Sequence, residues 1–158
     1  MRRKDREVTD RNEILQILDK AKVLHLGLYD GEYPYIVPMH YGYEYQDGTL
    51  IFYMHGAKEG RKMDILHRNP KVCIELESDI ELAPGGDIPC HYGAYFASVM
   101  GNGIAEVIND EQEKIQGLQQ LMRNQTGQEF AIDGAMAASV AVIKVTVAEF
   151  TAKARKKE

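Results

Sequence analysis

The sequence predicts a mainly β fold with flanking helices, in which about six antiparallel strands form a barrel or a curved sheet. Apolar and polar residues alternate along several segments, which is the period of a half-buried strand. Two Asp-Gly pairs, Asp30-Gly31 and Asp47-Gly48, separate such segments and are typical of hairpin turns. Few segments have the spacing of a helix, so the helices are expected at the margins of the sheet.

Helices are expected in three places along the chain. Asp10 and Glu13 form the pattern of a capping box, and apolar residues then recur at helical spacing, which predicts a helix over about 11–20. A short helix is expected over 61–68, stopped by an Asn-Pro pair. Asp110 caps a third helix, whose apolar positions are Ile115, Leu118, Leu121 and Met122.

Strands are predicted over residues 23–29, 33–45, 49–55, 72–77, 92–108 and 138–151. The second of them contains Pro34 and Pro38, which lack the N–H group that a ladder uses. That strand should therefore be irregular or lie on an edge of the sheet. The segment 78–91 is rich in glycine and proline and is expected to be a long loop beside a site or an interface.

The composition is typical of a soluble protein, with 44% hydrophobic and 27% charged residues among 158. A net charge of −5 argues against binding to nucleic acid, and no apolar stretch reaches the roughly 18 residues of a membrane span. Cys73 and Cys90 form no CxxC motif and no secretory leader is visible, so a cytoplasmic protein is expected. Residues 1–158 are interpreted as one domain with basic tails at about 1–8 and 153–158.

A group of cations stands between two long segments without lysine or arginine, and it comprises Lys58, Arg61, Lys62, Arg68 and Lys71. A helix over 61–68 would present unpaired N–H groups at its start, where cations cost stability unless an anion offsets them. Gly56, Ala57 and Gly60 allow the backbone to approach a ligand closely. The pattern favours a phosphate site, and the alternative is a solvated helix start at the surface.

Other motifs of nucleotide and catalytic sites are absent. The chain contains no GxxxxGK[ST] loop, no GxGxxG turn after a strand and no GxSxG elbow. Cys73 lies in an alternating strand, where a buried, inert thiol is expected. The candidate metal ligands His40, His55, His91 and Cys90 lack the paired spacing of a metal site, so no metal is expected.

Several segments together resemble a known family over nearly the whole chain. They are Met1-Arg2-Arg3-Lys4, Pro34 to Pro38 with the following Tyr41, Tyr53 to Lys62 with Asp64, Asn69-Pro70-Lys71-Val72, Tyr95 to Val99 with Gly103, and Phe150 to Lys153. In order and spacing they are similar to the nitroimidazole-resistance (Nim-like) branch of the pyridoxamine 5′-phosphate oxidase-like, FMN-binding split-barrel superfamily. The resemblance implies a six-stranded antiparallel split β-barrel and a homodimer with FMN at the subunit interface.

The resemblance also implies roles for individual residues. Phosphate contacts would come from Lys58, Arg61 and Lys62, with Ser98 on the adjacent strand. The remaining cofactor-binding residues would be Val37, Pro38, Met39, His40, Tyr41, Tyr53, His55, Gly56, Ala57 and Gly60. His55 and His40 are the candidate proton donors, because imidazole titrates near neutral pH. The alternative for His55 is a histidine that only hydrogen-bonds the neighbouring loop.

The function that the resemblance implies is an FMN-dependent oxidoreductase that reduces small electron-poor acceptors such as nitroaromatics, nitroimidazoles or quinones. NAD(P)H remains a possible transient electron donor, since a hydride donor can stack on a bound flavin without a Rossmann unit. One alternative is a flavin- or haem-binding protein without turnover, with His55, His40 or His91 as the axial ligand of haem. Another is oxidation of pyridoxamine 5′-phosphate itself.

Overall fold

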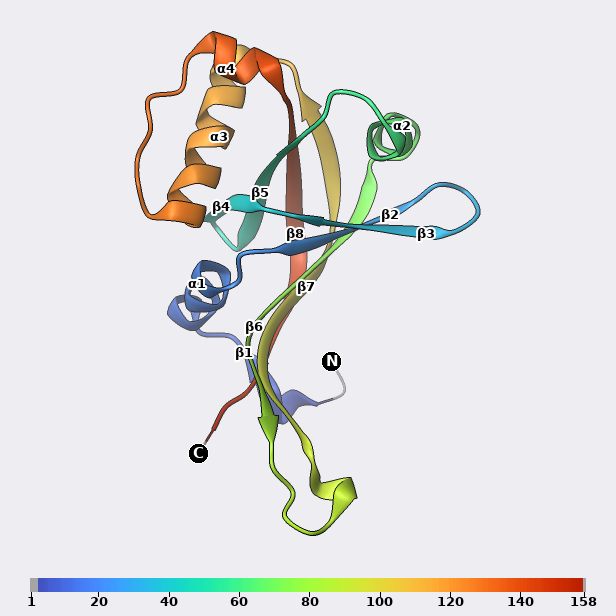
Figure 1. The fold of residues 1–158 in the computed structure, drawn as a ribbon, viewed down its shortest axis with the longest axis vertical. Helices are drawn as coiled ribbons and strands as arrows, with labels where there is room; N and C mark the ends of the chain where they lie inside the picture. Colours follow the sequence, from blue (N-terminus) through green and yellow to red (C-terminus); the bar gives the residue numbers. More distant parts are fainter. Residues whose placement is uncertain (1–2, 158) are drawn as a thin grey trace.

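The computed structural model describes residues 3–157 as an eight-stranded antiparallel sheet with helices around it (Figure 1). The hydrogen-bonded order of seven strands is β3-β2-β6-β7-β8-β5-β4, and β1 pairs separately with β8. The strands are β1 Glu7–Val8, β2 Leu24–Tyr29, β3 Pro34–Met39, β4 Tyr41–Gln46, β5 Thr49–Gly56, β6 Lys71–Ala83, β7 Gly93–Ile108 and β8 Ala141–Arg155. The mainly β fold class is confirmed.

Three of the four α-helices that the structure describes begin where the sequence predicts. The four are α1 Arg11–Lys20, α2 Arg61–Arg68, α3 Glu111–Thr126 and α4 Gly134–Ser139, with short 3-10 turns η1 Lys4–Arg6 and η2 Pro89–His91. The carboxylates of Asp10 and Asp110 accept hydrogen bonds from the N–H groups three residues on, which caps α1 and α3. Helix α4 was not expected, because its six residues are too short for a periodic pattern.

The segment 33–45 was predicted as one strand and forms two. β3 and β4 lie at opposite ends of the strand order and are joined through His40 alone, so the sheet curves until its two ends meet along the chain. β3 pairs only with β2, which places Pro34 and Pro38 on an edge as expected. This division and the short β1 account for eight strands in place of six.

Of the fourteen residues predicted as a loop over 78–91, the first six are strand. β6 continues to Ala83 through an irregularity between Ser78 and Glu81, and it pairs with β7 in a long hairpin that projects from the barrel (Figure 1). A bulge keeps the pairing intact despite the polar, glycine-rich sequence beyond it. The connection proper is confined to residues 84–92.

The basic segments predicted as tails are also partly ordered. Glu7 pairs with Lys153 and Val8 with Ala152, so both chain ends add to one sheet. Ala152, which stands between Val8 of β1 and Val99 of β7 in the register, is 2% exposed and belongs to the hydrophobic core. Met1, Arg2 and Glu158, which belong to the same predicted tails, lie outside the described residues.

The barrel interior is filled by alternate residues of the strands, among them Leu26, Phe52, Met54, Ile74, Val99, Ile143 and Val145, all fully buried. Helix α3 packs across the outside of β4 and β5 (Figure 1). Its backbone comes so close at Gly42 that a Cβ there would lie 2.2 Å from the carbonyl carbon of Gln120. None of the described helices is long and apolar enough to cross a membrane.

Candidate functional site

The start of α2 lies beside the end of β5 and the inner face of β3. Gly60 precedes the helix with φ of 117°, a conformation that L-residues rarely adopt, and no side chain caps the helix. The N–H groups of its first turn therefore lack the side-chain acceptor that Asp10 and Asp110 provide for α1 and α3. The helix dipole therefore makes the local potential positive at this point.

Lys62 carries a half-buried ammonium group into this corner. Its Nζ lies 3.3 Å from the sulfur of Met39, and a Cβ on Gly56 would lie 2.7 Å from the same Nζ. Burial lowers the pKa of Lys62 below its ordinary value. No carboxylate among residues 3–157 forms an ion pair with it, so the charge lacks a counter-ion within the described chain.

Arg61 is placed differently, although it is the next residue along. Its Nη2 lies 2.5 Å from Oδ2 of Asp30, and its guanidinium stacks 4.5 Å from the ring centre of Tyr35. The other oxygen of Asp30 accepts the N–H groups of Glu32 and Tyr33. The hydrogen bond from Arg61, together with these two, lowers the pKa of Asp30 to about 2. Sequence reasoning treated Asp30 only as a turn residue and missed this pairing.

His55 lies close enough to Lys62 and His40 for both to influence its charge. Desolvation, and then the charges of Lys62 and His40, lower the pKa of His55 below its ordinary value of 6.5, so it is neutral at pH 7. Nδ1 of His40 lies 3.0 Å from the carbonyl oxygen of Lys22. Because a carbonyl only accepts, this Nδ1 carries the proton, and the Nε2 of neutral His40 is an acceptor.

The expected residues of β3 and of the loop before α2 surround the same corner. On β3, Met39 is buried and Val37 half-buried, while Pro38 is exposed on the opposite face. Ala57 and Lys58 are exposed between β5 and α2. The structure thus brings together most of the predicted site, namely Val37 to His40, His55 to Lys58, and Gly60 to Lys62.

Two tyrosines predicted to bind the cofactor point elsewhere. Tyr41 is fully buried, and its hydroxyl lies 2.7 Å from the carbonyl oxygen of Leu18 and 2.9 Å from that of Ala21, to which it donates. Tyr53 is 4% exposed and packs against Gly117 of α3. Because helices α1 and α3 cover these rings, only the backbone atoms of Tyr41 and Tyr53 are left to contact a cofactor, and their place in the cofactor site stays a prediction.

Ser98 also lies away from this corner. Its strand, β7, is separated from β5 by β8, so the two strands are not adjacent as predicted. Ser98 pairs with Lys153, whereas Gly56 pairs with Ala141, and these partners stand near opposite ends of β8. Within one chain, Ser98 therefore cannot contact a ligand held at the start of α2.

An apolar groove of about 1020 Å³ occupies the outer face of the sheet over β2, β3, β6, β7 and β8. Ile36, Met100 and Ile104 are each about half exposed or more on its walls. Cys73 also lines it and is exposed, so the expectation of a buried thiol is wrong. The alternation along β6 places Cys73 on the outward face because the inward positions are taken by Val72 and Ile74.

The comparisons with known proteins agree with this fold. The family model described as pyridoxamine 5′-phosphate oxidase matches residues 10–154. The chain belongs to this family. It is 34% identical to a protein from Bacteroides thetaiotaomicron VPI-5482 that is provisionally named a 5-nitroimidazole antibiotic resistance protein. That match covers 93% of this chain and 85% of the other, with a TM-score of 0.76. The resemblance to the nitroimidazole-resistance branch is thereby confirmed.

More distant members of this fold also superpose well. The flavocytochrome from Azotobacter vinelandii gives a TM-score of 0.78 at 22% identity, covering 99% of this chain and 72% of that one. An FAD- and haem-binding protein from Mycobacterium smegmatis gives 0.78 at 15% identity, covering 96% and 74%. At these identities the likeness concerns the fold alone. No curated protein matches the sequence of this chain.

Proposed function

We propose that this chain of the pyridoxamine 5′-phosphate oxidase family is a flavoprotein that binds FMN at the start of α2. The observation that carries the proposal is the half-buried ammonium of Lys62, which has no carboxylate partner in residues 3–157 and lies at an uncapped helix start. A phosphate dianion would accept from Lys62 and from the free N–H groups of the first turn. Gly56 leaves room for the Nζ of Lys62, and no atom lies within 4 Å of the position that a Cβ on Gly60 would take. The residues therefore fit a phosphate.

Arg61 and Lys58 complete this phosphate site. Arg61 would keep its stacking on Tyr35 and share its guanidinium between Asp30 and the phosphate, while exposed Lys58 would approach from the loop. The backbone of Val37 to His40 would run along the edge of the ring system, since β3 has no strand on its far side. FMN is proposed rather than FAD because its terminal phosphate places two charges on one phosphorus, whereas each phosphate of the FAD diphosphate carries one.

We further propose that the protein is an oxidoreductase that reduces small electron-poor acceptors, including nitroimidazoles, other nitroaromatics or quinones. The flavin would supply the electron transfer. This chain would bind the phosphate, orient the ring along β3 and hold a proton at an imidazole. His55 suits that role better than His40, whose Nδ1 proton is already donated to Lys22. Burial, and then the charge of Lys62, lower the pKa of His55, and a phosphate bound to Lys62 would offset the second of these effects.

We also propose that the protein is a homodimer in which the second subunit completes the cofactor site. Ser98 lies far from α2 in its own chain, so it could contact the cofactor only from a partner. The groove walls carry exposed apolar side chains that a second copy would cover. Light scattering with size exclusion should give twice the chain mass, and Ile36→Lys should shift it to the monomer. Phe130→Lys, an exposed apolar residue outside the groove, should leave the dimer intact.

The cofactor is tested by the absorbance spectrum of the purified protein before and after addition of FMN, with identification of the flavin that heat releases. Arg61→Ala combined with Lys62→Ala should weaken FMN binding at least about 100-fold, the loss expected for two charge-assisted contacts. Arg68→Ala, at the other end of the same helix, is the matched control. Unchanged FMN affinity in the double variant would show that the phosphate site is assigned wrongly. Release of FAD would overturn the choice of FMN.

The reaction is tested by oxidation of NAD(P)H in the presence of a nitroimidazole or a quinone. Turnover that depends on the acceptor supports the oxidoreductase. Oxygen uptake with pyridoxamine 5′-phosphate would instead indicate the oxidase. A Soret band in place of flavin absorbance would indicate a haem protein. Of the three candidate axial ligands, His91 lies on η2 of the projecting hairpin, apart from His40 and His55.

A further inference from the structure

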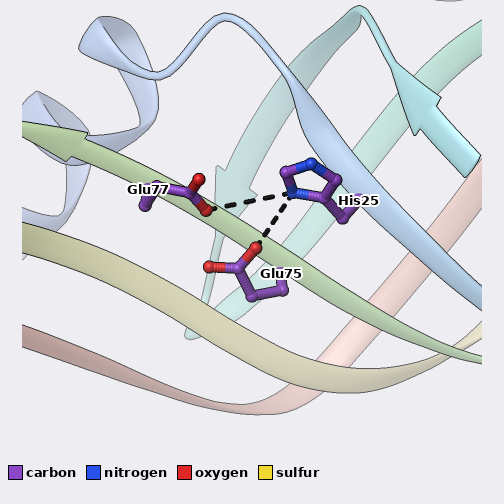
Figure 2. Close-up of side chains that lie close together, drawn as sticks. All are labelled: His25, Glu75 and Glu77. Carbon is purple, nitrogen blue, oxygen red and sulfur yellow. Dashed lines mark hydrogen bonds and ion pairs between the residues drawn. The ribbon is translucent and has the colours of Figure 1, made fainter. Parts of the chain in front are cut away.

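A second group of side chains lies on the outer face of the sheet, away from α2. His25 of β2 stands directly opposite Glu75 of β6 in the strand register, and Glu77 is two residues further along β6 on the same face. Figure 2 shows the imidazole and the two carboxylates pointing toward one another from these strands. None of the three belongs to the proposed FMN site.

The distances among these groups are those of ligands around one ion. Nδ1 of His25 lies 3.0 Å from Oε2 of Glu75 and 3.9 Å from Oε2 of Glu77, and one ligand atom of each residue lies within 4.8 Å of the others. Ligand atoms bound at about 2.1 Å in a tetrahedral site are about 3.4 Å apart. Small side-chain rotations would therefore bring all three to one metal ion.

The charge of the group favours a cation. Two carboxylates face a single imidazole, because Glu75 and Glu77 lie on the same face of β6 and His25 stands opposite Glu75. A divalent ion would offset the repulsion between the two glutamates. All three side chains are between 30% and 38% exposed, so an ion can enter from solvent without opening the fold.

We propose that His25, Glu75 and Glu77 form a binding site for a divalent transition-metal ion. One imidazole nitrogen and two carboxylates are a ligand set that suits Zn²⁺, Mn²⁺ or Fe²⁺ better than Ca²⁺ or Mg²⁺, which prefer oxygen ligands alone. Three protein ligands leave at least one coordination position of the metal ion open. Because His25 and Glu75 also line the apolar groove that the proposed second copy would cover, a water molecule held at that interface would fill this position.

Sequence reasoning missed this group because its members are fifty residues apart and no helical motif links them. The group can be recognised only from the strand register. Two glutamates stand at alternate positions of β6, and His25 lies opposite the first of them. Without the pairing of β2 with β6, that signal cannot be recognised.

The test is titration of the full-length protein, purified with its bound cofactor and stripped of metal, with Zn²⁺ in competition with a chromogenic chelator. The wild type should bind one Zn²⁺ per chain, and Glu77→Gln and His25→Gln should each weaken binding at least about tenfold. Glu149→Gln and His67→Gln are the matched controls, one on the far part of the groove and one on α2. Glu77→Gln alters a partly exposed side chain without changing its shape, and an unchanged melting temperature would verify the fold of the variant.

The ligands themselves are tested by X-ray absorption at the zinc edge. One imidazole nitrogen with oxygen ligands and no sulfur is the expected shell. Zinc–sulfur scattering, or loss of binding in Cys73→Ser, would show that the thiol in the groove takes up zinc and would overturn the proposal. Equal zinc affinity of the wild type and Glu77→Gln would also overturn the proposal. The contact between His25 and Glu75 would then be an ordinary cross-strand hydrogen bond.

Discussion

The ammonium group of Lys62 lies 3.3 Å from the thioether sulfur of Met39, a contact with no opposite charge. A sulfur atom is a weak acceptor and does not replace the water that Lys62 loses on partial burial. The fold therefore holds a cation in a position that costs stability until an anion binds. Removal of this charge should therefore weaken FMN binding, and it should maintain or raise the stability of the flavin-free protein.

Lys62→Met tests this opposition. Methionine has a similar length and packs beside Met39 without a charge, so the protein without flavin should be as stable as the wild type or more stable. FMN affinity should fall about 10- to 100-fold, the loss of a charge-assisted hydrogen bond of roughly 1.5–3 kcal/mol. Thermal unfolding without and with FMN measures both effects. A variant that loses stability without flavin would contradict the interpretation of Lys62 as an unpaired cation.

Asp30→Asn tests the competition for Arg61. Asparagine keeps the Oδ1 acceptor for Glu32 and Tyr33 but removes the negative charge that holds the guanidinium. FMN should bind several-fold more tightly, because Arg61 is released and a repulsive charge is lost. Since the pKa of Asp30 is about 2, this gain should not change with pH between 5 and 8. Weaker binding in the variant would mean that Asp30 positions Arg61 for the phosphate.

His55 should make the flavin-free protein less stable in mild acid. Its folded pKa lies below the ordinary 6.5, so above that pH the side chain is neutral in both states and has no effect. As the pH falls below 6.5, the unfolded chain takes up the proton first and stability is lost until the folded pKa is reached. Urea unfolding between pH 5 and 8 should show a smaller pH dependence for His55→Gln than for the wild type. His67→Gln, exposed on α2, should retain the wild-type dependence.

Tyr41→Phe separates a structural role from a cofactor role. The substitution removes the hydroxyl that satisfies the carbonyl oxygens of Leu18 and Ala21 at the end of α1, and it should cost about 1–3 kcal/mol of unfolding free energy. FMN affinity should be unchanged, because the ring is fully buried beneath the helix. Denaturant unfolding and flavin titration of the same preparation check the two expectations. Loss of FMN binding at full stability would restore Tyr41 to the cofactor site.

Gly42→Ala tests the contact between α3 and β4. The new Cβ would lie 2.2 Å from backbone atoms of Gln120 and Leu121, which cannot move without shifting the helix. The expected loss is about 3 kcal/mol of unfolding free energy. Gly27→Ala is the control in another strand, where the nearest atom would be 3.4 Å away. Equal stabilities of the two variants would mean that α3 does not pack against β4 this closely.

The sequence determined what depends on neighbouring residues. The capping pairs at Asp10 and Asp110, the Asp47-Gly48 turn and the Asn-Pro stop after α2 each set a local conformation, so their elements appear where predicted. The cation-rich start of α2 was recognisable for the same reason, since the charges and the helix signal lie within a few residues. The rest of the predicted site came from the segments whose order and spacing resemble a known family.

Only the tertiary structure decided which side chains meet across the sheet. The alternation of β5 could not show that α3 covers Tyr53 and leaves His55 exposed, because that depends on where a distant helix packs. Strand order removed Ser98 from the corner at α2, and strand register brought His25 to Glu75 and Glu77. Asp30 likewise meets Arg61 only because β2, β3 and α2 converge. Such contacts depend on which distant strands and helices pack together. The residues next to either partner in the sequence do not indicate that packing.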